Sequence, residues 1–147
     1  MPREPDVWVV DSSILVGYLR GGHYDAILRR EIRRGGVFLP GVVLFELQAG
    51  ATTRADRADV ETLRRALGQR IVGTTPDDWV LAGRCLARYA ERWGSLRPRD
   101  HVADALVAVT AARLGATVAT EDVHGMTRWA SALRRQGAGI RVATLTP

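Results

Sequence analysis

The sequence predicts an α/β fold in which a mostly parallel sheet of four to five strands lies between two layers of helices. Short apolar runs recur along the 147 residues and alternate with longer segments whose apolar residues are three and four positions apart. Such alternation is typical of a parallel sheet that is covered on both faces. Because no internal repeat or linker interrupts the pattern, we expect a single domain over residues 1–147.

The first half of the chain is expected to hold two strands, each followed by helices. Residues 7–10 are a continuous apolar run, and the serines behind it can cap a helix that two glycines end near residue 20. Residues 24–34 have apolar side chains on one side and arginines opposite, which indicates an amphipathic helix. A second strand over residues 37–39 is closed by a proline and leads into a short apolar helix over residues 42–49.

The middle of the chain is expected to be mainly helical. Residues 54–67 are charged but carry apolar residues at helical spacing, and residues 71–72 form a weak strand. Thr75 is followed by Pro76 and two acids, which is a favourable helix start. Threonine caps a helix, proline is tolerated in the first turn, and acids favour the positive end of the helix dipole. Residues 94–99 are expected to form a loop.

The last third is expected to alternate again. Residues 103–114 are nearly all apolar and predict a buried helix, followed by a strand over residues 117–119. A helix over residues 123–136 and a last strand over residues 140–145 complete the pattern. Right-handed crossovers between parallel strands place the strand carboxyl ends along one edge of the sheet, where ligands bind in such folds.

Three aromatic residues, Trp79, Tyr89 and Trp93, lie at helical spacing after the predicted helix start. This spacing is more typical of a stripe that faces the core than of a platform for stacked nucleic-acid bases. Cys85 lies in the same segment and is the only cysteine, so the chain has no internal disulfide. We expect a buried structural thiol rather than a nucleophile.

The charge pattern suits a polyanionic partner such as nucleic acid, because all 21 basic residues are arginine and the formal net charge is +5. Arg29, Arg30, Arg33 and Arg34 crowd one short helix. An equally open alternative is that the arginines form a solvated face in an arginine-rich composition. The N-terminal segment lacks a leader pattern, and no apolar run approaches about 18 residues. We therefore expect a soluble cytoplasmic protein without a membrane span.

Four carboxylates lie in or directly after apolar segments. Asp11 follows the first strand, Glu46 lies on the apolar face of its short helix, and Asp104 opens the apolar helix. Asp122 follows the strand over residues 117–119. Singly, these acids could cap helices or hold a turn. Taken together they favour a shared site, because buried acids are rarely left unpaired and the topology leads them to one edge.

Clustered carboxylates cannot all ionise without a nearby cation, and the hard cations Mg²⁺ and Mn²⁺ take oxygen ligands. Such a metal can activate water and neutralise charge on a phosphate. This is nuclease chemistry, and it needs no histidine, cysteine or lysine. The histidines His23, His101 and His124 lack the spacing of zinc ligands, so we interpret them as surface or supporting groups.

The segments that carry these acids resemble, in their order and spacing, the PIN domain, and within that family the VapC toxins of bacterial toxin–antitoxin pairs. The matching segments are residues 9–13, 45–47, 104–111 and 119–122, and they extend over essentially the whole chain. The segment after Thr120 departs from the family pattern, with Glu121 where relatives often have another polar residue and His124 where an aromatic segment is frequent.

The resemblance implies a PIN-like three-layer α/β/α fold and a site formed by the four acids with two supporting polar groups. The catalytic and metal-binding residues would be Asp11, Glu46, Asp104 and Asp122, supported by Ser13 and Thr120. The implied activity is a Mg²⁺- or Mn²⁺-dependent endoribonuclease that hydrolyses structured RNA such as transfer or ribosomal RNA. The implied partners are a small antitoxin protein and a second copy of the chain, in a prokaryotic cytoplasm.

Two other functions compete with this one. Phosphotransfer through Asp11, as in haloacid-dehalogenase-like enzymes, needs a second acid two residues later, where this chain has Ser13. A catalytically silent module that binds RNA or a protein partner is the main alternative, since a fold does not determine a function. The complete set of four acids disfavours it.

Overall fold

A five-stranded parallel sheet forms the centre of the computed structural model, which describes residues 6–146. The strand order is β3-β2-β1-β4-β5, and all paired neighbours run parallel. The strands are β1 (Trp8–Val10), β2 (Val37–Pro40), β3 (Ile71–Val72), β4 (Thr117–Ala119) and β5 (Arg141–Ala143). The α/β/α prediction and its mostly parallel sheet are confirmed. The polar N-terminal segment that lacked a leader pattern falls largely in residues 1–5, outside the described residues.

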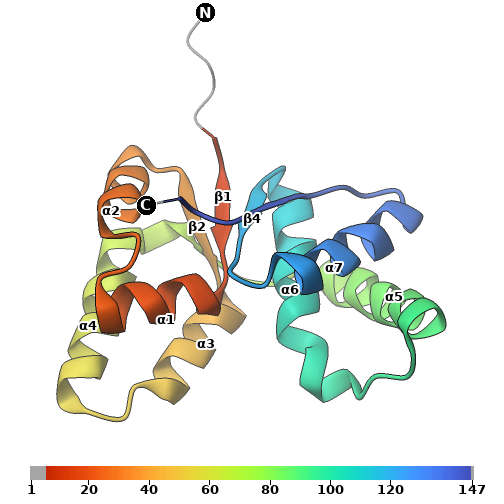
Figure 1. Ribbon diagram of the computed structural model, residues 1–147, viewed down its shortest axis with the longest axis horizontal. Helices are drawn as coiled ribbons and strands as arrows, with labels where there is room; N and C mark the ends of the chain where they lie inside the picture. The colour runs from red at the N-terminus through yellow and green to blue at the C-terminus, as the bar shows by residue number, and fades with distance from the viewer. Residues whose placement is uncertain (1–5, 147) are drawn as a thin grey trace, which may run out of the picture.

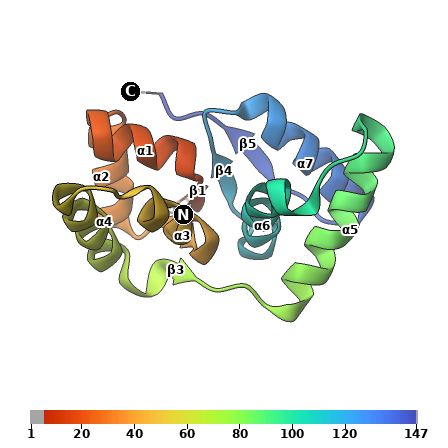
Figure 2. The same ribbon diagram turned by 90° about the horizontal axis from the view of Figure 1, so that it is seen from below.

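Within residues 6–146, seven helices cover the sheet. They are α1 (Ser12–Gly21), α2 (Asp25–Arg34), α3 (Gly41–Gly50), α4 (Arg54–Leu67), α5 (Pro76–Trp93), α6 (Pro98–Leu114) and α7 (Val123–Arg135). A short 3-10 turn, Gly68–Arg70, joins α4 to β3. Figures 1 and 2 show α1 to α4 on one side of the sheet and α5 to α7 on the other. This division follows from right-handed crossovers, because the chain moves from β1 outward to β3 and then across to β4 and β5.

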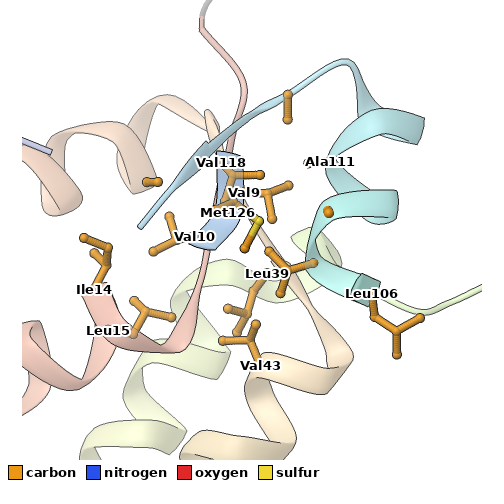
Figure 3. Packing of buried hydrophobic residues seen from close by; sticks show 14 of the residues in the cluster. Val9, Val10, Ile14, Leu15, Leu39, Val43, Leu106, Ala111, Val118 and Met126 are labelled. Atoms are coloured by element: carbon orange, nitrogen blue, oxygen red, sulfur yellow. The ribbon is translucent and has the colours of Figure 1, made fainter. Parts of the chain in front are cut away.

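The core lies where the central strands meet helices from both layers. Val9 and Val118 are fully buried on the neighbouring strands β1 and β4. Ile14 and Val43 reach this core from α1 and α3, and Leu106 reaches it from α6 (Figure 3). Burial on both faces explains why the strands are continuous apolar runs without polar alternation. It also makes the carboxyl edge of the sheet a rigid base for any side chain that follows a strand.

The start of α5 agrees with its predicted capping signal, whereas α1 is capped by Asp11 and not by Ser12 or Ser13, which lie in its first turn. Thr75 caps α5 with a reciprocal capping box, in which Asp78 N–H donates to Thr75 Oγ1 at 3.2 Å and Thr75 N–H donates to Asp78 Oδ2 at 2.9 Å. Thr53 caps α4 in the same way with Asp56. The start of α6 differs from the prediction, because the helix begins at Pro98 rather than near residue 103. Proline in the first turn pre-sets the helical backbone, so the loop is shorter than expected.

The expectation that the aromatic stripe of α5 faces the core is only partly correct. Tyr89 is buried, whereas Trp79 is 52% exposed at the start of the helix and Trp93 is half-buried at its end. Cys85 is buried, as expected, and burial raises the pKa of its thiol to about 11. Among the described helices, none is both long enough and apolar enough to cross a membrane.

Candidate metal centre

The four predicted acids come from four separate elements at the carboxyl edge of the sheet. Asp11 directly follows β1 and is the N-cap of α1, and Asp122 follows β4 and is the N-cap of α7. Glu46 lies in α3. Asp104 lies in the second turn of α6 rather than at its N-terminus, so favourable contact with the helix dipole does not explain its place. Figure 2 views the molecule from below, onto the side where β1 leads into α1 and β4 leads into α7.

Asp11 is the most firmly held of the acids. It is only 8% exposed, and its Oδ1 accepts hydrogen bonds from the backbone N–H of Ser13 at 3.0 Å and of Ile14 at 3.4 Å. The hydroxyl of Ser13 also donates to Oδ1 of Asp11. Asp11 therefore caps α1, as the alternative interpretation of this acid predicted. Capping uses one oxygen, and no further hydrogen bond within residues 6–146 reaches the other.

Asp122 has the same arrangement on the other side of the site. Its Oδ1 accepts a hydrogen bond from the backbone N–H of Gly125 at 3.0 Å. Its own backbone N–H donates to Oγ1 of Thr120 at 3.0 Å. Thr120 is fully buried directly after β4, so its hydroxyl anchors the turn that presents Asp122.

The electrostatics of Asp104 show that the four carboxylates are close enough to influence one another. Desolvation by the surrounding protein raises the pKa of Asp104, and the negative charges of Asp11, Glu46 and Asp122 raise it further. The charge of His101 acts in the opposite direction and lowers it. The Asp104 side chain is still reached by solvent, so the cluster opens toward water on that side. The sequence prediction that these acids meet is consistent with this geometry.

These residues fit a hard divalent cation by their donor chemistry. The cluster consists of carboxylate oxygens, and its excess negative charge is what such a cation would neutralise. As it stands, no group of three or more acidic, histidine or cysteine side chains within residues 6–146 is drawn together at ligand spacing. The carboxylates would therefore have to move closer together to bind one ion.

Two supporting contacts join the site across the gap between α1 and the turn after β4. The hydroxyl of Ser13, besides donating to Asp11, accepts a hydrogen bond from the backbone N–H of Glu121 at 3.0 Å. The phenol of Tyr24 donates to Oε1 of Glu121 at 3.1 Å. Sequence analysis selected Ser13 as a supporting residue but missed Tyr24. The hydrogen bond from Tyr24 to Glu121 spans 97 positions of sequence, so no local pattern indicates it.

Gly125 was also missed. A side-chain carbon at position 125 would stand 2.2 Å from Oδ2 of Asp122, a distance that real contacts do not reach. The close approach of the Asp122 carboxylate therefore requires glycine in the first turn of α7. In the sequence, the only signal for this role of Gly125 is its position three residues after an acid that can cap a helix.

The family model of the PIN domain matches residues 8–128. The chain belongs to the PIN domain family. The matched region contains the four acids and both supporting residues, so the site described above lies within the PIN domain. A comparison with curated protein sequences found no match.

Solved structures with the same fold share little sequence with this PIN domain. A chain of VapBC2 from Rickettsia felis, bound to a DNA fragment from their promoter, is 16% identical with a TM-score of 0.72, and the match covers 95% of this chain and 99% of that one. DNA-bound VapBC from Salmonella typhimurium gives 16% identity and a TM-score of 0.68, over 95% of this chain and 98% of that one. FitAcB from Neisseria gonorrhoeae gives 20% identity and a TM-score of 0.64, over 92% and 96%. These likenesses establish the fold.

Proposed function

We propose that this PIN domain is a Mg²⁺- or Mn²⁺-dependent endoribonuclease that acts as the toxin of a toxin–antitoxin pair. The observation that supports it most is the convergence of Asp11, Glu46, Asp104 and Asp122 on one open site, where three acids raise the pKa of the fourth. A purely structural use of these side chains would leave this repulsion uncompensated. A divalent cation would compensate it and would supply positive charge to a phosphodiester substrate.

Each residue has a distinct part in the proposed reaction. Asp11 and Asp122, which are fixed by their capping hydrogen bonds, would hold the cation together with Glu46 and Asp104. Ser13 keeps the Asp11 carboxylate oriented, and Thr120 holds the turn that carries Asp122. When bound, the metal supplies positive charge to the phosphate and lowers the pKa of a water molecule. The expected products carry a 5′-phosphate and a 3′-hydroxyl, because water rather than the ribose 2′-hydroxyl attacks.

We propose RNA cleavage rather than phosphotransfer through Asp11. Oδ1 of Asp11 is engaged by two backbone N–H groups and by the Ser13 hydroxyl, which suits a fixed metal ligand more than an attacking nucleophile. The substrate is a structured RNA such as transfer or ribosomal RNA, by the family resemblance. The enzyme is proposed to act in the cytoplasm of a prokaryote as a homodimer.

A small antitoxin protein is the proposed partner that masks the site. The similar VapBC structures are complexes of two proteins, and this chain offers a surface suited to such a partner. A cavity of about 530 Å³ lies among α1, α2 and α4, and a smaller hollow beside Glu46 lies among α1, α3 and α4. Leu19 and Asp59 line both, so the two hollows adjoin, and we call them together the trough, with Glu46 in the wall of its smaller part. A partner segment with apolar residues and an arginine that reaches Glu46 would suit this trough.

The decisive experiment measures cleavage of transfer RNA and ribosomal RNA by the purified chain. Wild type should cleave with Mg²⁺ or Mn²⁺, fail in EDTA, and leave 5′-phosphate ends, whereas Asp104→Asn should be inactive in every condition. The exposed acid Asp77 on α5 provides a matched control, so Asp77→Asn should cleave like wild type. Cyclic 2′,3′-phosphate ends, or full activity in EDTA, would contradict the mechanism. A folded wild type that binds these RNAs but never cleaves them would support the silent binding module instead.

A further inference from the structure

An aromatic and basic surface lies where α5, α6 and α7 meet, and one of its rings, His101, is one helical turn from Asp104 on α6. Tyr89 packs against Trp93 and Trp129, with ring centres 4.8 and 4.5 Å apart, and His101 stacks on Tyr89 at 6.5 Å. These rings come from the end of α5, the first turns of α6 and the middle of α7. Tyr89 and Trp129 are buried in this cluster, whereas Trp93 forms its half-exposed margin.

Two guanidinium groups gather at this margin. The guanidinium carbons of Arg92 and Arg128 lie 5.1 and 5.7 Å from the centre of the Trp93 ring. Within the described part of the chain, neither arginine has an acidic partner within 4.0 Å. Both guanidinium groups lie over the half-exposed indole of Trp93, and their positive charge is available to a phosphate there.

The arginines of α2, which sequence analysis favoured for phosphate binding, differ in this respect. Arg29 pairs with Asp25 at 2.7 Å, and Arg30 and Arg34 both pair with Glu31 at 2.7 and 3.6 Å. Only Arg33 of that group has no such pair among the described residues. The two acids of α2 offset half of its positive charge and engage three of its four arginines, whereas both arginines at Trp93 are unpaired among the described residues, so the margin around Trp93 is the stronger site for an anion.

The position of this margin relative to the acids suits a nucleic acid that reaches them. His101 precedes Asp104 by three positions on α6, which places the two on the same face of the helix. Its charge acts on Asp104, as described above. The connection between α5 and α6, which follows Trp93, lies on the side of the molecule toward which the carboxyl ends of the strands point (Figures 1 and 2).

We propose that Trp93, Arg92 and Arg128 form a platform for single-stranded RNA, in which an unpaired base stacks on the arginine-covered indole while flanking phosphates bind the guanidinium groups. This inference rests on the proposed RNA-cleaving function and adds where, and in which form, the substrate is held. Stacking on an aromatic ring accepts every base, and arginine adds a charge for the backbone, which are the two components of sequence-tolerant binding to single strands. Paired bases are already stacked on their neighbours, so the platform requires an unpaired segment.

The test measures binding of an unstructured oligoribonucleotide of about twelve residues in EDTA, where cleavage cannot occur. Fluorescence anisotropy of the labelled RNA should show that Trp93→Leu weakens binding roughly fivefold or more. Trp79→Leu, which alters an exposed tryptophan at the other end of α5, should bind like wild type. Binding of the corresponding duplex should not depend on Trp93. Equal affinities of Trp93→Leu and wild type for the single strand would overturn the proposal.

A second variant guards against a loss of folding, since Trp93 packs on Tyr89. Arg92→Gln combined with Arg128→Gln leaves the rings in place. This double variant should lower the slope of the logarithm of the binding constant against the logarithm of the salt concentration by about 1.4, since each lost phosphate contact on a single strand removes roughly 0.7. Arg84→Gln combined with Arg134→Gln, on the same two helices, should leave the salt dependence unchanged. An unchanged slope in the first double variant would also overturn the platform. Because all these measurements exclude metal, a failure of RNA cleavage would leave them interpretable.

Discussion

The carboxylate of Asp122 occupies the space that a side chain at Gly125 would need. Gly125 donates its backbone N–H to Oδ1 of Asp122 at 3.0 Å, and a carbon added to Gly125 would stand 2.2 Å from Oδ2. The two residues therefore form one unit at the start of α7, in which glycine allows the acid to cap the helix and still face the site.

Gly125→Ala should move the Asp122 carboxylate away from the site without unfolding the protein. We expect Mn²⁺ affinity, measured by titration calorimetry, to fall several-fold, because one of the four acids is displaced. Gly83→Ala is the matched control, since nothing lies within 4 Å of that helical glycine. This control should bind Mn²⁺ like wild type and gain roughly 0.5–1 kcal/mol in the free energy of unfolding. Equal metal affinity in Gly125→Ala and wild type would refute the positional role of Gly125.

Ser13→Ala should weaken the site through a different contact. The lost hydroxyl leaves the Glu121 backbone N–H without its acceptor and removes one donor from Asp11, at a cost of about 1 kcal/mol of stability. We expect slower metal-dependent cleavage as well, because the Asp11 carboxylate is less firmly held. Ser12→Ala, one position earlier on α1, should change neither quantity. The prediction fails if Ser13→Ala and Ser12→Ala are indistinguishable in urea unfolding and in RNA cleavage rate.

Asp104→Asn should stabilise the metal-free protein at neutral pH. The pKa of Asp104 is raised in the folded state by desolvation and by the three neighbouring acids, so the folded state holds the proton more tightly than the unfolded state. Its contribution to stability is therefore fully present below the ordinary aspartate pKa and is lost as pH rises through the raised pKa. Melting temperatures in EDTA across this pH range should converge for wild type and Asp104→Asn in acid and diverge toward neutral pH. A difference that does not vary with pH would contradict the coupling.

Asp59→Arg should separate the proposed partner from the proposed chemistry. Asp59 lines both hollows of the trough but lies outside the acid cluster, so reversal of its charge should weaken binding of a basic partner segment. Growth arrest by this variant should then persist when the small protein encoded beside it is co-expressed, whereas wild-type arrest should be relieved. Asp77→Arg, on the distant α5, should behave like wild type. Rescue of the Asp59→Arg strain would show that the partner does not use the trough.

Much of the fold follows from local signals in the sequence. The strands are the continuous apolar runs, because both faces of the sheet are covered, and the start of α5 follows from the capping box of Thr75 and Asp78. Asp11 and Asp122 could be placed at one edge of the sheet from the sequence, because each follows a parallel strand and caps the next helix. Glu46 and Asp104 lie within helices, so their positions depend on how α3 and α6 pack.

The parts that were missed depend on contacts distant in sequence or on ambiguous periodicity. Helical spacing predicted that Trp79 faces the core, but it lies in the first turn of α5, is exposed, and donates its indole N–H to Thr74 Oγ1. The start of α6 at Pro98 was missed because its N-cap, Arg97, has no capping side chain. The ion pair of Arg29 with Asp25 is indicated in the sequence by a four-residue spacing on one helix. This spacing makes α2 a weaker candidate for binding nucleic acid.

The most direct test of the central claim is a Mn²⁺ titration followed by electron paramagnetic resonance, in which free Mn²⁺ is counted without any substrate. Wild type and Asp77→Asn should bind Mn²⁺ with equal affinity, and Asp11→Asn and Asp104→Asn should each bind at least about tenfold more weakly, because each removes a carboxylate from the shared cluster. If all four proteins bind Mn²⁺ equally, or if none binds it while all remain folded, the four acids do not form a metal centre.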